Sequence, residues 1–310
     1  MFNKEGFCTN ADNVYLVTSD ESNFLARRVA EHLIATGDEV IVINNANTGP
    51  PERIAEAEMM SVPVGSEQMS ARLGGLEKRL NVIHCATPHG DERDPIKNAE
   101  RDYLEQVAFL MFCKQFEAHR LVVCLDAELL FANPFELPVS ETDKESPKNL
   151  AGVNQLALES HLPLIGLPWI SARIATLYGP GQTKGIVPDI FSILTDDEPL
   201  ELYRPEICTK DFVHVDDAVR GVLNAAQSDR TGIFNFSSGR ETHIAAMAKL
   251  MRRILASKSP ITETVTREFF YQRFCFSPTK AFNALGWQAS IPLKAGLERT
   301  AAWLRDDPLS

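Results

Sequence analysis

The chain has little positive charge for its length, and this shortage limits the partners it can bind. Its 310 residues carry 31 lysines and arginines against 42 aspartates and glutamates, which gives a formal net charge of -11. Binding to nucleic acid or to an anionic membrane depends on clustered Lys and Arg, because these side chains neutralise phosphates. We therefore expect neither nucleic acid nor a membrane as partner, although a few local cations can still hold a small anionic ligand.

Long apolar runs and a leader sequence are missing as well. No apolar stretch approaches the roughly 20 residues that span a bilayer. Lys4, Glu5 and Asn10 interrupt the region in which a signal peptide would be apolar. These absences predict a protein of the cytoplasm.

Paired cysteines and metal-ligand clusters are also lacking. The chain has six cysteines without any Cys-x-x-Cys spacing, and most of them lie in apolar segments. This pattern favours reduced, buried thiols over disulfides. Neither His84 nor His89 has cysteines or carboxylates at the spacing of a metal site, so we expect no metal.

What the chain does contain is a series of short apolar segments separated by helical patterns. They are Val14 to Thr18, Val40 to Ile43, Asn81 to Cys85, Leu121 to Leu125, Pro168 to Ala172, Asp211 to Val215 and Gly232 to Ser237. Near-continuous apolar strands that alternate with helices are typical of a parallel sheet covered on both faces. The sequence therefore predicts an α/β fold with a Rossmann-like, doubly wound parallel sheet.

Glycine is missing from the first turn between a predicted strand and a helix. In a dinucleotide-binding fold this turn reads Gly-x-Gly-x-x-Gly, since the absence of side chains lets backbone amides and the helix N-terminus approach the pyrophosphate. The three positions hold Ser19, Ser22 and Leu25. The usual phosphate contact is therefore not available in this turn.

The sequence pattern changes after about residue 180, where prolines interrupt the alternation of predicted strands and helices. We predict a Rossmann-like domain of the dinucleotide-binding type over residues 1–172, with its last strands returning at about 209–237. Residues 173–310 are expected to form a smaller C-terminal α/β lobe that binds substrate.

Four later segments follow one another in the order and spacing of a known family. They are Arg173 to Gln182 (RIATLYGPGQ), Lys210 to Ala218 (KDFVHVDDA), Phe234 to Gly239 (FNFSSG) and Ala281 to Trp287 (AFNALGW). The chain resembles the extended short-chain dehydrogenases, and among them the NAD-dependent nucleotide-sugar epimerase/dehydratase family. The resemblance implies NAD or NADP as cofactor and a nucleotide sugar or nucleotide as ligand.

The chain departs from this family at the catalytic positions. The family's Tyr-x-x-x-Lys pair falls on Lys148 and Gly152 by alignment of Ser146-Pro147, and no tyrosine of the chain is followed by a lysine four residues later. In such a pair the lysine lowers the pKa of the tyrosine, so that the phenol can exchange a proton at neutral pH. The position of the assisting Ser or Thr is occupied by Ala127.

The cofactor positions implied by the resemblance are altered in parallel. They correspond to Ser19, Ser22, Asn23, Asn44 and Ala86. Asn44 replaces the acid that would bind the ribose hydroxyls, although an amide can also bond a hydroxyl. The changes predict that NAD or NADP is held weakly or not at all.

The substrate positions are better preserved. The resemblance assigns substrate binding to Tyr178, Lys210 and Arg273, with Lys210 in place of the family's arginine. A lysine keeps the positive charge but loses the bidentate fork of a guanidinium. Asp216 and Asp217 are expected to cap a helix that begins at Ala218.

Three interpretations of the sequence remain open. The first is a catalytically impaired protein that binds a nucleotide sugar or a partner, as a homodimer or in a complex with an active homologue. The apolar residues of the helix expected over 99–119 cover most of its circumference, which favours a subunit interface. The second is an active epimerase or dehydratase that uses Lys148, Asp126 or His84 as acid and base. The third is a structural or regulatory protein without a small ligand.

Overall fold

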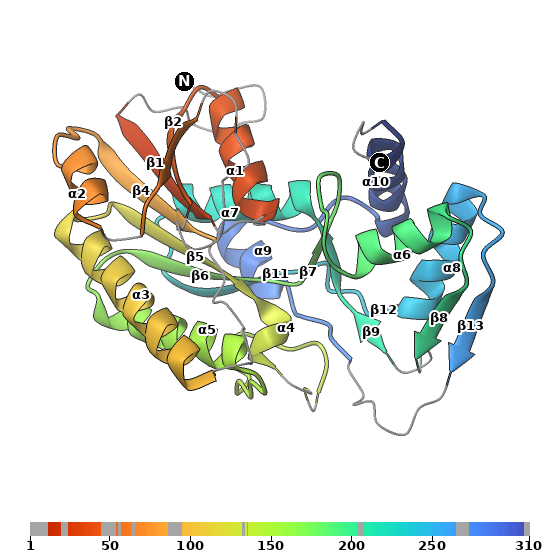
Figure 1. Ribbon diagram of the computed structural model, residues 1–310. Helices are drawn as coiled ribbons and strands as arrows, with labels where there is room; N and C mark the ends of the chain where they lie inside the picture. The colour runs from red at the N-terminus through yellow and green to blue at the C-terminus, as the bar shows by residue number, and fades with distance from the viewer. Residues whose placement is uncertain are drawn as a thin grey trace. The chain divides into compact units, whose positions relative to one another are not determined.

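Six of the seven segments predicted as strands of a parallel sheet lie side by side in the computed structural model of the chain (Figure 1). The prediction is wrong for Asp211 to Val215, which forms a short strand, Phe212–His214, that pairs outside the main sheet. The structure describes residues 12–19, 24–44, 54, 57–63, 66–85, 95–131, 134, 136–203, 208–264 and 273–306. The described strands form a seven-stranded sheet of order β11-β6-β5-β4-β1-β2-β3. Their bounds are β1 Asn13–Ser19, β2 Glu39–Asn44, β3 Glu58–Ser61, β4 Arg79–His84, β5 Arg120–Asp126, β6 Trp169–Ile174 and β11 Gly232–Phe236.

The direction of the pairing confirms the predicted doubly wound parallel sheet. Strand β1 pairs in parallel with β2 on one side and with β4 on the other, and β2–β3 and β4–β5 are also parallel. The strand order therefore reverses beside β1, which is where open α/β sheets bind ligands, at the carboxyl ends of the strands. Val14 to Val17 in β1 are almost fully buried, as a strand covered on both faces requires.

Helices cover both faces of this sheet. Their bounds are α1 Phe24–Ala35, α2 Glu67–Leu73, α3 Pro95–Gln115, α4 Ala127–Leu130, α5 Leu150–His161 and α7 Val215–Gln227, and the 3-10 turn η2 spans Leu162–Leu164. Helices α3 and α5 lie together on one face, and α1 and α7 lie on the other (Figure 1). The short helix α4 follows β5 directly, so it lies at the carboxyl end of that strand.

The chain forms two compact units. Unit 1 comprises residues 1–131, 145–173 and 219–234, and unit 2 comprises residues 132–144, 174–218 and 235–310. The described residues of unit 2 form three small two-stranded sheets: β7 Thr176–Tyr178 with β10 Phe212–His214, β9 Thr209–Lys210 with β12 Thr242–His243, and β8 Leu200–Tyr203 with β13 Ile261–Thr264. Its helices are α6 Ile186–Thr195, α8 Ile244–Leu255, α9 Thr279–Leu285 and α10 Leu293–Asp306.

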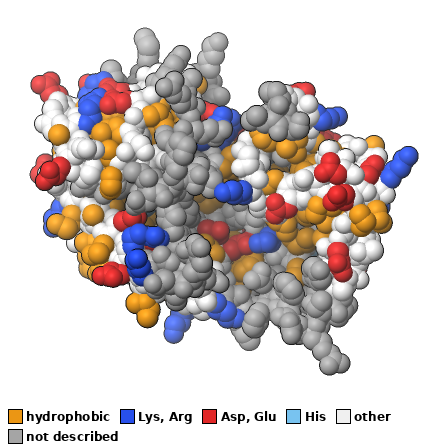
Figure 2. Space-filling view, viewed as in Figure 1, with side chains coloured by type: hydrophobic (Ala, Val, Ile, Leu, Met, Phe, Trp, Pro, Cys, Tyr) orange, Lys and Arg blue, Asp and Glu red, His pale blue; other side chains and the backbone are white. Residues whose placement is uncertain are grey.

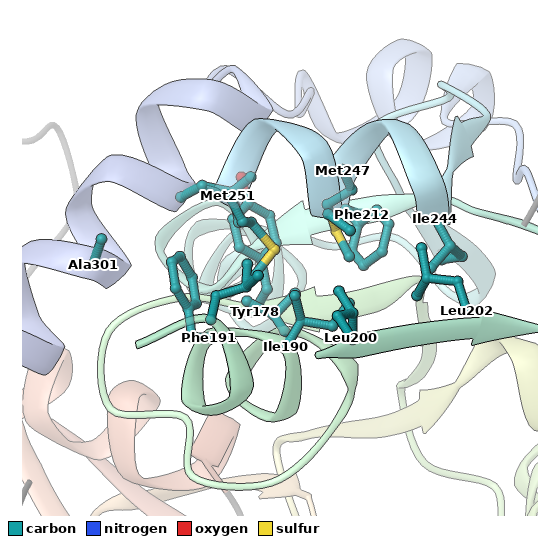
Figure 3. Close-up of a cluster of buried hydrophobic side chains, with 14 residues drawn as sticks. Tyr178, Ile190, Phe191, Leu200, Leu202, Phe212, Ile244, Met247, Met251 and Ala301 are labelled. Atoms are coloured by element: carbon teal, nitrogen blue, oxygen red, sulfur yellow. The ribbon is translucent and has the colours of Figure 1, made fainter. Parts of the chain in front are cut away.

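Unit 2 has an apolar core of its own. Helices α6, α8 and α10 and strands β7, β8 and β10 contribute side chains that pack together (Figure 3). Phe191, Met251 and Leu297 in this cluster are fully buried. Because these three residues come from three different helices, the cluster ties distant parts of unit 2 together.

One sequence-based boundary is wrong. Helix α7 begins at Val215 and not at Ala218, so Asp216 and Asp217 lie inside its first turn. The carboxylate of Asp217 accepts hydrogen bonds from the backbone N–H groups of Ser290 (2.9 Å) and Ile291 (2.8 Å). It therefore anchors the segment before α10, a contact between residues more than 70 positions apart that local pattern does not reveal.

Candidate functional site

The carboxyl end of β5 is closed by the turn of helix α4. Asp126 is the N-cap of this helix, and its Oδ1 accepts a hydrogen bond from the backbone N–H of Glu128 at 2.9 Å. Ala127, the first residue of α4, is fully buried. The position that the sequence resemblance assigns to an assisting hydroxyl thus holds a buried methyl group, which can neither donate nor accept a proton.

The start of α5 packs tightly against α4. Asn149 is the N-cap of α5 and accepts from the backbone N–H of Gly152 at 2.8 Å, while Lys148 lies exposed just before the helix. A Cβ atom at Gly152 would lie 2.1 Å from the carbonyl oxygen of Leu129 and 2.9 Å from Cβ of Pro147. No side chain fits at residue 152, so α5 cannot present a lysine from this position.

The polar side chain that α5 does direct to the end of β5 is Gln155, which was not among the sequence-predicted site residues. It is 1% exposed, and its Oε1 accepts a hydrogen bond from the backbone N–H of Asp126 at 3.1 Å. Its Nε2 has no hydrogen-bond partner among the described residues. A polar residue on the buried face of a mostly apolar helix is the signal that could have identified it.

A buried ion network lies one turn further along α5. Glu159 accepts from Nε of Arg173 at 2.9 Å and from Oγ of Ser171 at 2.5 Å, and Nη2 of Arg173 bonds both Glu159 and Glu145. Phe131 lies 5.5 Å from the guanidinium carbon. Because the buried guanidinium of Arg173 is ion-paired through Nε and Nη2, the network fixes the segment that leads into α5 on β6.

On the cofactor side, the structure describes two of the five predicted residues. Ser19 ends β1 and pairs in register with Asn44, which ends β2 and is 2% exposed. Both therefore lie at the carboxyl edge of the sheet, beside the reversal of strand order. Ser22, Asn23 and Ala86 lie outside the described residues.

His84 lies at the same edge, at the end of β4. Its Nδ1 is 2.6 Å from the hydroxyl oxygen of Thr18 on β1, and its ring stacks on Phe109 with ring centroids 4.1 Å apart. Burial disfavours the charged form and lowers the pKa of His84 to about 4. The imidazole is therefore neutral at pH 7.

The predicted substrate residues all lie in unit 2. Tyr178 is 1% exposed and belongs to the apolar core (Figure 3). Its hydroxyl closely approaches the backbone of Gly296. A Cβ atom at Gly296 would lie only 2.2 Å from that hydroxyl oxygen, which explains the glycine. Burial of the Tyr178 side chain fixes the position of β7 and of the residues that follow this strand.

Lys210 and Arg273 come from neighbouring segments, since Thr209 of β9 forms an isolated bridge with Arg273. Nε and Nη2 of Arg273 donate to the two oxygens of Glu241 at 2.5 and 2.8 Å, and the hydroxyl of Thr209 donates to Glu241 at 2.6 Å. The Lys210 ammonium lies 5.7 Å from the centre of the Phe274 ring. One edge of the Arg273 guanidinium, formed by Nε and Nη2, is thus bonded to Glu241, and Nη1 lies on the opposite edge.

Comparison with known proteins gives these residues a context. A model of the NAD dependent epimerase/dehydratase family matches residues 22–236. The chain belongs to this family. The absence of the Tyr-x-x-x-Lys pair is therefore a feature of one member, and not evidence for a different family.

Curated relatives match this chain over most of its length. A putative UDP-glucose 4-epimerase from Methanocaldococcus jannaschii is 22% identical over 305 residues, which cover 94% of this chain and 99% of the relative. UDP-glucuronic acid decarboxylase 1 from Arabidopsis thaliana is 23% identical, with 94% of this chain and 70% of the relative covered.

Solved structures of other proteins share this fold. UDP-glucose 4-epimerase from Thermotoga maritima, solved with UDP-glucose, has a TM-score of 0.85 at 23% identity and covers 94% of this chain and 98% of its own. The UDP-glucose 4-epimerase from Thermus thermophilus, solved with NAD, has a TM-score of 0.82 at 23% identity, with 95% and 99% covered. At these identities the likeness shows the fold.

The described residues lack three further features. No group of three or more His, Cys, Asp or Glu side chains there could hold a metal ion. None of the described helices is long and apolar enough to cross a membrane. The cysteines within the described ranges form no disulfide.

Proposed function

We propose that this family member binds a nucleotide sugar without carrying out the proton and hydride transfer of an epimerase or dehydratase. The observation that carries the proposal is the chemistry at the carboxyl end of β5. The buried methyl group of Ala127 follows β5 directly, and the amide of Gln155 accepts a hydrogen bond from the backbone N–H of Asp126. Neither can exchange a proton at neutral pH, and loss of a positioned acid or base typically costs about 10²- to 10⁴-fold in rate.

The alternative, an active enzyme with unusual acid and base residues, is less well supported by the same geometry. Asp126 is engaged as the N-cap of α4. His84 is buried and neutral, with a pKa of about 4, far from the value near 7 that suits a general base. Lys148 precedes α5 on an exposed segment, whereas Ala127, which follows β5 directly, is buried.

The proposed ligand class rests on unit 2 and on the relatives. Lys210 and the outer edge of Arg273 supply positive charge in a protein of net charge -11. The Thermotoga maritima relative was solved with UDP-glucose. We infer that the diphosphate of a nucleotide sugar is attracted to Lys210 and Arg273, and that NAD or NADP binds weakly or not at all because the first turn lacks glycine. The reduced cysteines fit a cytoplasmic protein.

A ligand screen with a turnover assay tests this proposal. Thermal shifts are measured with UDP, dTDP, UDP-glucose, NAD and NADP, and conversion of UDP-glucose in the presence of NAD is followed by NMR. We expect a shift with the nucleotide sugar, since a ligand at 100 times its dissociation constant stabilises by about 2.7 kcal/mol. K210A should reduce that shift, whereas K294A, which changes an exposed lysine of α10, should not.

The outcomes separate the three interpretations. Turnover that is abolished by a substitution at Asp126, Lys148 or His84 would show an active enzyme and refute the proposal. Shifts with none of the nucleotides would favour a structural or regulatory protein. A shift with NAD alone would contradict the inferred loss of cofactor binding.

We further infer that α3 pairs this chain with a second copy of itself. Four large apolar side chains of α3 are exposed: Ile96 (83%), Tyr103 (46%), Leu104 (58%) and Met111 (67%). Their spacing of 7, 1 and 7 residues places them on one helix face and is symmetric about the middle of the stripe. In an antiparallel pair around a two-fold axis, Ile96 would thus face Met111 of the second copy, and Tyr103 would face Leu104.

Neighbouring contacts make this surface rigid. On the inner side of α3, Asp102 accepts from Nδ2 of Asn154 at 2.9 Å, and Gln106 donates to the carbonyl of Asn154 at 3.0 Å. Val153 on α5 is also exposed, at 49%. Figure 2 shows apolar side chains exposed among charged ones over the region in which Figure 1 labels α3.

Sedimentation of the purified chain tests the pairing. We expect a dimer that L104E converts to monomer, because a carboxylate at the centre of the stripe would be buried twice across the axis. F282E is the matched control, since Phe282 is 52% exposed but lies on α9 in unit 2. If the chain is a monomer and associates with an active homologue on mixing, the homodimer is refuted and a mixed complex is indicated instead.

A further inference from the structure

We propose that Gln155 is a ligand-binding residue whose Nε2 group donates a hydrogen bond to an uncharged oxygen, a hydroxyl or carbonyl, of a ligand bound at the carboxyl end of β5. The proposal rests on the proposed function as a nucleotide-sugar binder and adds a residue that the sequence resemblance did not assign. Gln155 itself lies in unit 1.

The orientation of the amide follows from its neighbour. The backbone N–H of Asp126 points at the side chain of Gln155 from 3.1 Å. An N–H group needs an acceptor, so the oxygen of the amide must face Asp126 and the NH₂ group must face away. The flipped amide would set two donors against each other, so the unpaired Nε2 is not an ambiguity of assignment.

The unpaired donor calls for an explanation. Gln155 is 1% exposed, and Nε2 finds no acceptor in the described part of the chain. Buried side-chain donors in proteins are nearly always paired, because burying one without an acceptor destabilises the fold. A ligand oxygen that completes the bond accounts for a donor that the protein itself leaves open.

The place of Gln155 in the fold agrees with a ligand site. It lies one turn from the tightly packed Gly152, and its oxygen bonds the last residue of β5. Ligands of doubly wound sheets bind outside the carboxyl ends of the strands. Of the buried residues of α5, Gln155 is the one whose hydrogen bond reaches that edge through Asp126.

The charges around this edge select the chemistry of the ligand group. Asp126 and Glu128 belong to the α4 turn, and Glu145 and Glu159 lie on the segments that flank it, whereas Arg173 is consumed by two of these carboxylates. Carboxylates at these positions repel a phosphate or carboxylate group that is brought beside them. An uncharged hydroxyl or carbonyl of a sugar or a ribose fits the neutral amide donor.

Two substitutions of similar size test the proposal by reversing each other. Q155E keeps an oxygen for the N–H of Asp126 but has no donor at pH 8, whereas Q155K keeps a donor but loses the oxygen. If Nε2 binds the ligand, the dissociation constant for UDP-glucose should rise about tenfold in Q155E and stay within about threefold in Q155K. If Gln155 serves only to hold Asp126, the order should be the reverse.

Binding is measured by calorimetry with UDP-glucose, UDP and NAD. A loss for UDP-glucose but not for UDP assigns the oxygen to the sugar, and a loss for NAD assigns it to a cofactor ribose. Equal affinities in wild type and Q155E for all three ligands would overturn the proposal. Q155M, which has neither donor nor added charge, should bind as weakly as Q155E and replaces it if that variant does not fold.

The experiment separates this proposal from the proposed function. If wild-type protein turns UDP-glucose over, the proposed function fails, but the ratio of affinities still judges Gln155. If wild type binds UDP-glucose without turnover and Q155E binds equally well, the proposed function stands and Gln155 is a structural residue. If wild type binds none of the three, both proposals fail.

Discussion

Acidification should destabilise unit 1 through a single buried side chain, His84. The imidazole lies between the hydroxyl of Thr18 and the ring of Phe109 and is 7% exposed. Burial lowers its pKa from 6.5 to about 4. Between these two pKa values the unfolded chain binds a proton at His84 that the folded chain does not bind, so the free energy of unfolding falls as the pH drops through this interval.

The magnitude follows from the two pKa values. At pH 7 both states carry an almost neutral imidazole, and the penalty is small. At pH 5 the unfolded state is mostly protonated while the folded state is not, which removes about 2 kcal/mol of stability relative to pH 7. Below pH 4 the folded histidine also titrates, and this contribution levels off at about 3 kcal/mol.

Hydrogen exchange of the β1 and β4 amides measures this effect in unit 1, because slow exchange there reports the free energy of opening. The opening free energy is compared at pH 7 and pH 5 in wild type and in H84F, after correction for the intrinsic exchange rate. H84F keeps the stacking on Phe109 but removes the titrating group, and loss of the Thr18 partner lowers its stability equally at both pH values. Equal changes with pH in the two proteins would refute the reasoning.

Three further substitutions test the packing. A256G should raise the free energy of unfolding by about 0.5–1 kcal/mol in thermal melts, since Ala256 ends α8 in the left-handed region at φ 54°. A loss of stability in this variant would contradict the reasoning. G152A should destabilise by about 1–3 kcal/mol because of the Leu129 carbonyl, and G75A, where nothing lies within 4 Å, should stay within about 0.5 kcal/mol. In urea, D217A should lose about 2–4 kcal/mol and D217N about 1 kcal/mol, because the amide oxygen can keep the backbone bonds of the segment before α10; equal losses would exclude a role for those bonds.

Much of the fold could be predicted because it is written in local pattern. The apolar run Val14 to Thr18 became β1, Asn13–Ser19, and the run Leu121 to Leu125 became β5, Arg120–Asp126. A strand buried on both faces needs apolar residues throughout, so the pattern survives in a single sequence. The short strand β3, Glu58–Ser61, was not predicted, because an edge strand with exposed ends has no such run.

The candidate site was predictable only in part. The missing Tyr-x-x-x-Lys pair and the missing glycines are facts of sequence, and no structure is needed to see them. The alignment on Ser146-Pro147 led to Gly152, but the Leu129 carbonyl leaves no room there for a side chain. That contact depends on how α4 packs on α5, which sequence spacing does not contain.

By itself, then, the sequence determined the class of fold, the family and the absence of any Tyr-x-x-x-Lys spacing, because each of these is carried by residue identity and local periodicity. Only the tertiary structure decided that Gln155 faces the end of β5, that Glu241 holds one edge of Arg273, and that Asp217 anchors Ser290. The physical reason is distance along the chain. Hydrogen bonds and ion pairs between residues 29 to 73 positions apart depend on packing, and packing is fixed only when the whole chain has folded.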